Sequence, residues 1–248
     1  MRLVTKNHDV VISIPTRVVL MEEVRRRFRS KAGFQLATVN LDHLVKIDVN
    51  AGFARAYDQH DLIVADGNPI VWVSRMVGKP VELMPGSELV VPLCQLAAEE
   101  KTTVALVGST QATLDAAANH LMEKASGLNV VFTSAPAMGF DPESEAASEI
   151  LKDIAASGAG LCFLALGAPK QEIFSARGRE FAPNVGFASI GAGLDFFSGQ
   201  QVRAPKWARK LALEWLWRAL SSPRRMVPRY AKCFAILPGL VFRSIRER

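Results

Sequence analysis

The 248-residue chain has no apolar run of about 18 residues, the length that a membrane-spanning helix requires, so no such helix is expected. A signal peptide is not expected either, because the apolar run Val10–Ile14 is short and Pro15 follows it. Cysteine is scarce: Cys94, Cys162 and Cys233 lie far apart and form no CxxC pair. We therefore expect a cytoplasmic protein whose cysteines are buried and reduced.

Several short motifs of metal-binding and cofactor-binding proteins are also missing. The histidines at positions 8, 43, 60 and 120 have no metal-ligand spacing, and HExxH does not occur. Neither the dinucleotide fingerprint GxGxxG nor the P-loop GxxxxGK(S/T) is present. The sequence therefore predicts no metal site and no cofactor.

Charge is unevenly distributed along the chain, whose net charge is +6. Residues 203–248 hold 12 of the 30 Lys and Arg residues but only two of the 24 acidic residues, which gives this segment +10 and leaves −4 on the rest. A basic segment on a mildly acidic body favours an anionic partner: phosphate, a membrane surface or nucleic acid.

Before this basic segment, short apolar runs alternate with amphipathic stretches. The expected strands are Val10–Ile14, Gln35–Asn40, Leu62–Ala65, Thr103–Val107, Asn129–Thr133, Gly160–Leu166 and Val185–Ile190. The expected helices are Thr16–Arg29, Asn50–Tyr57, Pro69–Met76, Ser87–Glu99, Gln111–Lys124, Pro142–Ala156 and Lys170–Phe181. This alternation is typical of an α/β fold with a Rossmann-like, mostly parallel sheet flanked by helices. We expect two domains, an α/β catalytic domain (1–202) and a basic helical appendage (203–248).

The appendage begins with a predicted amphipathic helix, Ala204–Leu220, in which Trp207 and Trp215 share an apolar face. Further on, Phe234–Phe242 is apolar but is interrupted by Pro238-Gly239. Tryptophan and basic side chains on one helix fit an anionic membrane surface. The alternative is a packed C-terminal helix with a solvated basic face. Nucleic-acid binding is not expected, because no recognised motif accompanies the charge.

Small and polar residues follow five of the predicted strands. In chain order they are Thr38 and Asn40, then Asp66-Gly67-Asn68, Gly108-Ser109-Thr110, Gly167-Ala168-Pro169-Lys170-Gln171-Glu172, and Gly191-Ala192-Gly193 with Asp195 close behind. Ligands of open α/β sheets bind beyond the carboxyl ends of the strands. We therefore expect these residues to share one crevice.

Asp66 is the candidate general base of this crevice. A carboxylate directly after a strand is partly shielded, and shielding raises its pKa toward useful base strength. Asp is also a favoured N-cap, and Pro69 follows at the expected start of a helix. From spacing alone, capping is the better interpretation of Asp66.

Two other strand ends also allow two interpretations. Gly108-Ser109-Thr110 opens a helix, where backbone N–H groups and the helix dipole favour a phosphate, although an ordinary strand-to-helix turn fits equally. Lys170 and Gln171 follow Pro169 at a helix start, where Lys can meet phosphate and Gln can orient a ligand. A surface helix start, with Glu172 favoured by the helix dipole, is the alternative there.

Taken together, these segments resemble the WecG/TagA/CpsF family of bacterial glycosyltransferases, glycosyltransferase family 26. The resemblance rests on the motifs TVNLDH (38–43), ADGNP (65–69), GSEL (86–89), GAPKQE (167–172), GAGLDF (191–196), SG (198–199), RAP (203–205), EWLWR (214–218) and PRR (223–225). They run in family order from about residue 10 to about residue 235.

The resemblance implies a metal-independent, inverting transfer from a UDP-sugar to a polyprenyl-diphosphate-linked saccharide in cell-surface or exopolysaccharide synthesis. It places Asp66 at the general-base position and Thr38, Asn40 and Gln171 in the pocket. We add Asn68, Gly108, Ser109, Lys170, Gly191 and Asp195 as substrate-binding candidates from their strand ends. The resemblance also implies that the appendage docks on the inner face of the cytoplasmic membrane and supplies arginines to the site, here Arg218, Arg224 and Arg225. A homo-oligomer is possible.

One segment departs from the family pattern. The family usually has an arginine shortly before the GSEL-type motif, whereas this chain reads Glu82-Leu83-Met84-Pro85. The donor sugar is therefore left open between an N-acetylmannosamine-type sugar, N-acetylmannosaminuronic acid and glucose. A nucleotide-binding oxidoreductase and a non-enzymatic membrane or nucleic-acid binding module are the alternatives from other functional classes.

Overall fold

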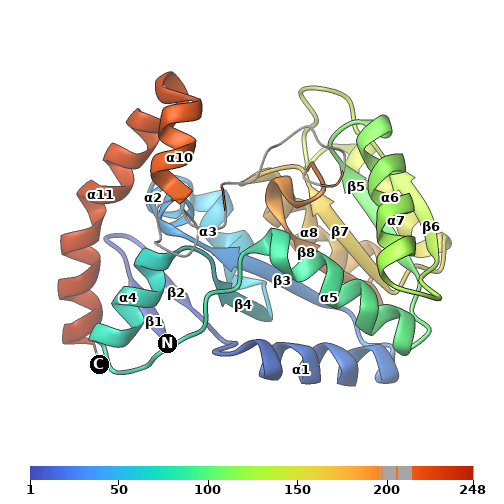
Figure 1. Ribbon diagram of the computed structural model, residues 1–248, viewed down its shortest axis with the longest axis horizontal. Coiled ribbons are helices and arrows are strands. Elements are labelled where there is room, and N and C mark those ends of the chain that lie inside the picture. The colour runs from blue at the N-terminus through green and yellow to red at the C-terminus, as the bar shows by residue number, and fades with distance from the viewer. Residues whose placement is uncertain (196, 198–204, 206–213, 248) are drawn as a thin grey trace.

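A six-stranded, fully parallel sheet forms the centre of the computed structural model, which describes residues 1–195, 197, 205 and 214–247 (Figure 1). The strand order is β4-β3-β8-β7-β5-β6. The strands are β3 (Phe34–Val39), β4 (Leu62–Ala65), β5 (Val104–Gly108), β6 (Val130–Ser134), β7 (Leu161–Ala165) and β8 (Gly186–Ser189). The predicted fold class, a Rossmann-like α/β arrangement, is confirmed.

Helices cover both faces of the sheet, so that most strands are buried on both sides and read as continuous apolar runs (Figure 1). One face carries α1 (Arg17–Ser30), α5 (Gly86–Glu99) and α6 (Gln111–Lys124). The other face carries α2 (Leu41–Val49), α3 (Ala51–Asp58), α4 (Asn68–Met76), α7 (Glu145–Ala156) and α8 (Lys170–Phe181). Each fully buried Leu, Ile, Val or Phe of these layers contributes about 1.5–3 kcal/mol relative to an exposed one.

Side-chain caps define where several of these helices begin. The hydroxyl of Thr16 accepts from the backbone of α1, that of Thr110 from α6 and that of Ser144 from α7. Asn40 and Asn50 cap α2 and α3 in the same way through their side-chain oxygens. The helix α2 was not predicted from the sequence, because the strand before it and the helix after it were each read without the short element between them.

The predicted strand Val10–Ile14 is not part of the central sheet. Strand β2 (Asp9–Val11) pairs antiparallel with β1 (Arg2–Val4) in a separate two-stranded hairpin. Beyond the hairpin, the backbone N–H of Ile14 donates to the carbonyl of Ile63 at 3.2 Å. The apolar run thus packs beside the sheet without becoming one of its strands.

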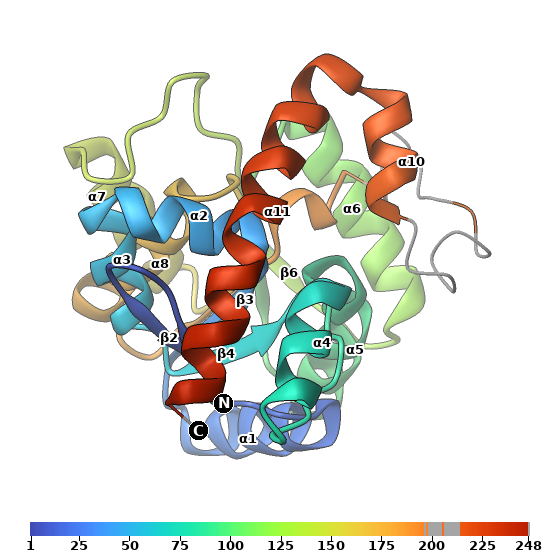
Figure 2. The same cartoon turned by 90° about the vertical axis from the view of Figure 1, so that its left-hand side faces the viewer.

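The C-terminal segment forms a helical hairpin of α10 (Glu214–Ser221) and α11 (Pro223–Arg246) (Figures 1 and 2). Helix α11 runs through Pro228 and Pro238 without ending, so the predicted break at Pro238-Gly239 is wrong. Of the predicted helix Ala204–Leu220, residues 204 and 206–213 lie outside the described residues. Within the described part of the chain, no helix combines the length and the apolar character needed to cross a membrane.

Helix α11 packs along α2, α4 and the β1–β2 hairpin (Figure 2). Its inward side chains, Met226, Cys233 and Leu240, are spaced by seven residues and are buried. Near its end, the Ser244 hydroxyl accepts from the Val4 backbone N–H at 3.1 Å, so the two chain ends lie side by side. All three cysteines of the chain are buried and unpaired, as predicted.

Candidate functional site

The carboxyl ends of the parallel strands bring the predicted site residues to one edge of the sheet. Val39 pairs with Ala65, Gly108 with Ala165, and Leu164 with Ser189, so these strands finish level with one another. Each is followed by a turn that leads into a helix or, after β8, into the 3-10 turn η1 (Gly191–Gly193). The predicted crevice therefore corresponds to one continuous edge of the fold.

Asp66 stands at the end of β4 and does not cap the helix that follows. Its backbone N–H donates to the carbonyl of Val39 at 2.8 Å, which extends the pairing of β3 and β4 by one residue. Gly67 then turns the chain with a φ of 98°, and it is the N-cap of α4, where no side chain makes a capping bond. The capping interpretation, which spacing alone favoured, is wrong.

Asn40 orients the Asp66 carboxylate. Its Oδ1 accepts from the backbone N–H of His43 at 3.1 Å, as the N-cap of α2. Because this bond fixes the oxygen end of the amide, Nδ2 is turned toward Asp66 and lies 3.4 Å from its Oδ2. Asn40 and Asp66, both predicted site residues, therefore form one partly buried unit.

Thr38, the third predicted residue of this unit, is anchored through its backbone. Its carbonyl accepts from the Tyr57 hydroxyl at 2.7 Å, and His43 Nδ1 lies 2.7 Å from the same oxygen. Burial lowers the pKa of His43 to about 4 and raises the pKa of Tyr57 well above its usual value, so both side chains are neutral near pH 7. On β3 the Thr38 side chain alternates with Val39 and shares a face with Leu36, toward α1 and α5.

Gln171 joins two of the strand ends. It lies in the first turn of α8 and is almost completely buried. Its Oε1 accepts from the backbone N–H of Gly191 at 3.1 Å, and its Nε2 donates to Glu172 Oε1 at 2.8 Å. Glu172 is fully buried, so the alternative that this segment is a surface helix start is wrong.

Ser109 and Asp195 join two further loops of this edge. The Ser109 hydroxyl donates to Asp195 Oδ1 at 2.8 Å, which links the turn after β5 to the segment after β8. A Cβ at Gly108 would lie 2.5 Å from the backbone of Ala165, so glycine allows β5 and β7 to approach closely where they end. The predicted residues of these two strand ends are thereby brought together.

The remaining predicted residues have different positions. Asn68 begins α4 and Lys170 begins α8, both partly exposed, and no bond between them and the other site residues is described. Arg218 lies in α10, whereas Arg224 and Arg225 lie in the first turn of α11. The Arg224 side chain is exposed, and the side chains of Arg218 and Arg225 are outside the described part. Their part in the site remains a prediction.

Sequence reasoning did not identify an ion cluster that holds α11 against α2. Asp42 Oδ2 lies 2.8 Å from Lys46 Nζ and 2.9 Å from Arg229 Nη2. Burial opposes ionisation of Asp42, but the bond to Lys46 and the charge of Arg229 outweigh it and lower its pKa. Lys46 also donates to the Ala168 carbonyl at 3.2 Å, in the loop before Gln171. Asp42 belongs to the motif TVNLDH, but no local pattern links it to a residue almost 200 positions later.

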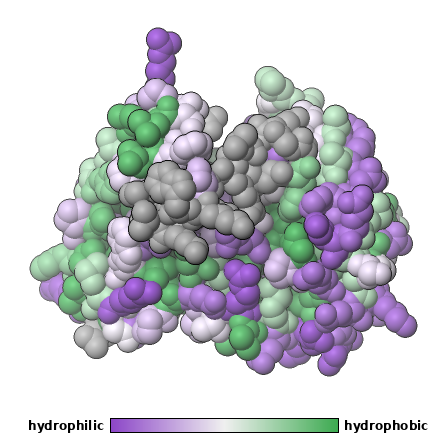
Figure 3. All heavy atoms as spheres, in the orientation of Figure 1, coloured by the Kyte–Doolittle hydropathy of each residue, from purple (hydrophilic) through white to green (hydrophobic). Residues whose placement is uncertain are grey.

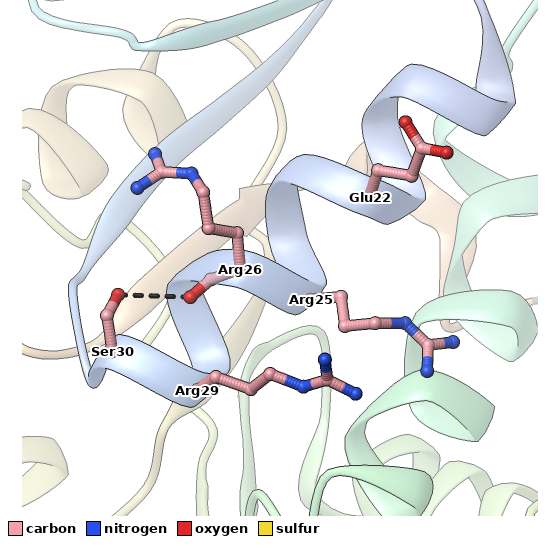
Figure 4. A pocket seen from close by; sticks show the side chains of 5 residues that line it. All are labelled: Glu22, Arg25, Arg26, Arg29 and Ser30. Atoms are coloured by element: carbon pink, nitrogen blue, oxygen red, sulfur yellow. Dashed lines mark hydrogen bonds between the residues drawn. The ribbon is translucent and has the colours of Figure 1, made fainter.

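A surface hollow on α1 does not belong to this edge (Figure 4). It is lined by Glu22, Arg25, Arg26, Arg29 and Ser30, and none of the predicted site residues takes part in it. Its arginines pair with carboxylates: Arg25 with Glu99 and Glu100, Arg26 with Glu23, and Arg29 with Glu100. Because the cations are already compensated, the hollow is a poor site for an anionic substrate.

A search for metal-ligand clusters covers the described residues. Among these residues, no group of three or more His, Cys, Asp or Glu side chains is placed to hold a metal ion. The oxygen-rich neighbours of Asp66 are amides and hydroxyls, which orient substrates through hydrogen bonds.

Comparison with known protein families gives one match that spans nearly the whole chain. The model of a family described as the glycosyl transferase WecG/TagA/CpsF family matches residues 6–248. The match includes every predicted site residue, the hairpin strand β2, and both α10 and α11.

Proposed function

The chain belongs to the glycosyl transferase WecG/TagA/CpsF family and is a glycosyltransferase of cell-surface polysaccharide synthesis, and on this premise we propose its reaction. The enzyme moves a sugar from UDP to a polyprenyl-diphosphate-linked saccharide, with inversion and without a metal. The donor carries an N-acetylmannosamine-type sugar, N-acetylmannosaminuronic acid or glucose. The oxidoreductase and the non-enzymatic binding module lose their support, since neither agrees with the family.

The observation that carries this proposal is the pairing of Asp66 with Asn40 at the strand ends. A general base needs a fixed carboxylate within reach of the hydroxyl that it deprotonates. The Nδ2 of Asn40 lies 3.4 Å from Asp66 Oδ2, and Asn40 cannot rotate without losing its cap on α2. In the proposed step, Asp66 takes the proton of the acceptor hydroxyl as its oxygen bonds to the anomeric carbon. The bond from that carbon to UDP breaks on the opposite side.

We place the donor along the loops after β5, β7 and β8. The turn Gly108-Ser109 leads to the N-terminus of α6, where backbone N–H groups and the helix dipole favour a phosphate. Asp195 bonds to Ser109 at 2.8 Å, and its negative charge would repel a diphosphate. We therefore assign Asp195 to a hydroxyl or N–H donor of the nucleoside, and Ser109, Lys170 and Gly191 to the diphosphate side. Thr38, Asn68 and Gln171 complete the proposed pocket.

The appendage is the proposed membrane contact at the inner face of the cytoplasmic membrane. Its exposed apolar side chains are Trp215, Leu216, Leu220, Val227, Phe234, Phe242 and Ile245. A hydrophobic patch accordingly lies over α10 and α11, at the upper left of Figure 3. Arg224 and Lys232 are exposed on the same hairpin. An apolar surface accompanied by cations suits an anionic membrane better than a solvated basic face does. In this proposal Arg218, Arg224 and Arg225 supply positive charge to the phosphate groups of the substrates.

Replacing Asp66 by asparagine tests the proposed base. With the full chain, UDP release is measured across UDP-sugars in the presence of a lipid-diphosphate saccharide acceptor. We expect Asp66→Asn to lower turnover by about 100-fold or more while UDP binding, followed by calorimetry, changes little. Asp153→Asn, an exposed change on α7, is the matched control. Wild-type turnover by Asp66→Asn would exclude Asp66 as the base, and a wild-type chain inactive with every UDP-sugar would exclude the donor class.

A further inference from the structure

Glu172 is a core carboxyl group that the proposed reaction does not use. It is fully buried in the first turn of α8, and its Oε2 has no hydrogen-bond partner among the described residues. Burial raises its pKa to about 7. An apolar side chain of similar length would fill this position without the cost of desolvating a carboxyl group. The carboxyl group therefore calls for an explanation other than packing.

The single side chain that Glu172 holds is Gln171, as far as the described hydrogen bonds extend. Glu172 Oε1 accepts from Gln171 Nε2 at 2.8 Å. The opposite end of the same amide, Gln171 Oε1, accepts from Gly191 N–H at 3.1 Å. An amide can turn over and exchange its oxygen and nitrogen ends. With Glu172 in place, a turned amide would set oxygen against oxygen at Glu172 and donor against donor at Gly191.

The amide orientation matters because Gly191 begins the loop after β8. Gly191 has a φ of 60° and opens η1, from which the chain continues to Asp195. Asp195 in turn accepts from Ser109 after β5, at 2.8 Å. A correctly turned Gln171 thus fixes the loop after β8 to the start of α8, and this loop is bonded to the turn after β5. Three of the strand ends assigned to the donor depend on this arrangement.

We propose that Glu172 is a positioning residue, which sets the orientation of the Gln171 amide and thereby the loop after β8 that receives the nucleotide. This inference rests on the proposed function, because it assumes that the nucleotide sugar binds along these loops. Glu172 itself touches neither substrate. Its loss should weaken donor binding and leave the proton transfer at Asp66 largely intact.

Two substitutions at position 172 test the proposal in the full chain. Glu172→Met removes the acceptor and keeps the length of the side chain, whereas Glu172→Gln keeps an oxygen that can accept from Gln171. We expect Glu172→Met to raise the KM for the UDP-sugar about tenfold with kcat changed less than about threefold, the effect of losing one orienting hydrogen bond. Glu172→Gln should raise KM by less than about threefold. Glu180→Met, at an exposed position of the same helix, is the control.

A purely structural role would give a different pattern. A damaged fold lowers the amount of active enzyme, and therefore kcat, in proportion to the loss of cooperative unfolding. Wild-type KM in Glu172→Met, a loss confined to kcat, or a Glu172→Gln variant as impaired as Glu172→Met would each overturn the proposal. If Glu172→Met does not unfold cooperatively, Glu172→Asp, which withdraws the carboxyl group by one methylene, is judged by the same criteria. A wild-type chain without turnover would instead refute the proposed function.

Discussion

The buried carboxyl group of Glu172 makes the stability of this protein depend on pH in a direction opposite to that of most carboxylates. Burial raises its pKa from the ordinary 4.5 to about 7, so the folded protein keeps a proton that the unfolded chain has already lost. Between these two values the folded state binds more protons, and the free energy of unfolding falls as pH rises. A shift of this size corresponds to about 3 kcal/mol once both states are ionised above pH 7.

Replacing Glu172 by glutamine removes this titration. The two proteins should have similar free energies of unfolding near pH 4.5, and the variant should gain up to about 3 kcal/mol over wild type by pH 8. Other titrating groups occur in both proteins and cancel in the difference. The buried histidines His43 and His60 do not disturb the comparison, because burial lowers the pKa of each to about 4.

Urea unfolding at half-unit steps of pH, followed by circular dichroism, measures the difference directly. Glu180→Gln, on the exposed side of the same helix, should show no pH-dependent gain. The reasoning is refuted if wild type and Glu172→Gln run parallel from pH 4.5 to 8, or if the variant is the less stable protein at pH 8. Either result would mean that Glu172 is ionised at neutral pH in the folded protein.

Two further predictions concern the appendage and the packing of α8. Replacing Trp215 and Phe234 together by serine should reduce sedimentation with phosphatidylglycerol vesicles, because their rings, 5.4 Å apart, are exposed on the α10–α11 hairpin, whereas serine at the exposed Met122 of α6 should not; equal sedimentation of both variants would argue against the hairpin as the membrane contact. Gly178→Ala should destabilise the protein by about 1–3 kcal/mol in urea unfolding, because the added Cβ would lie 2.4 Å from the Phe187 ring; an unchanged midpoint would show that the ring can move aside.

The layers of the fold could be predicted from the sequence because they follow from local patterns. Short apolar runs alternate with amphipathic stretches, and the strands of the central sheet lie where these runs predicted them. The separate β1–β2 hairpin could not be predicted in this way, since an apolar run does not specify which strand it pairs with. The pairing of β2 depends on Arg2–Val4, which has no strong strand pattern of its own.

Helix α11 shows how packing can override a local signal. Proline inside a helix costs about 3 kcal/mol, and the sequence therefore predicted a break at Pro238. Met226, Cys233 and Leu240, however, form a buried stripe at seven-residue spacing, while Pro228 and Pro238 lie on the exposed side. Burial of this stripe against α2 and the hairpin offsets the cost of the prolines. The seven-residue spacing was visible in the sequence, but its partner surface was not.

The residues of the candidate site were predicted better than their contacts. Asn40, Asp66, Gln171 and Gly191 were identified because polar residues after parallel strands meet at one edge. The burial of Glu172 was not predicted, because a Glu in the first turn of a helix normally faces solvent and interacts with the helix dipole. Its environment is created by α8 packing on the sheet and on α3, which no neighbouring residue in the sequence indicates.

The first turn of α2 connects the candidate base to the appendage. Asn40 begins this helix and orients Asp66, and two residues later Asp42 binds Arg229 of α11 at 2.9 Å. Lys46, one turn further on, binds both Asp42 and the carbonyl of Ala168 in the loop before Gln171. A displacement of α11 relative to the sheet must therefore either break the ion pair or move the helix on which Asn40 is the cap. Because a carboxylate stripped of one of two bound cations at a half-buried position is costly, the second course conserves more free energy, and the position of the appendage and the geometry at Asp66 are mechanically linked through α2.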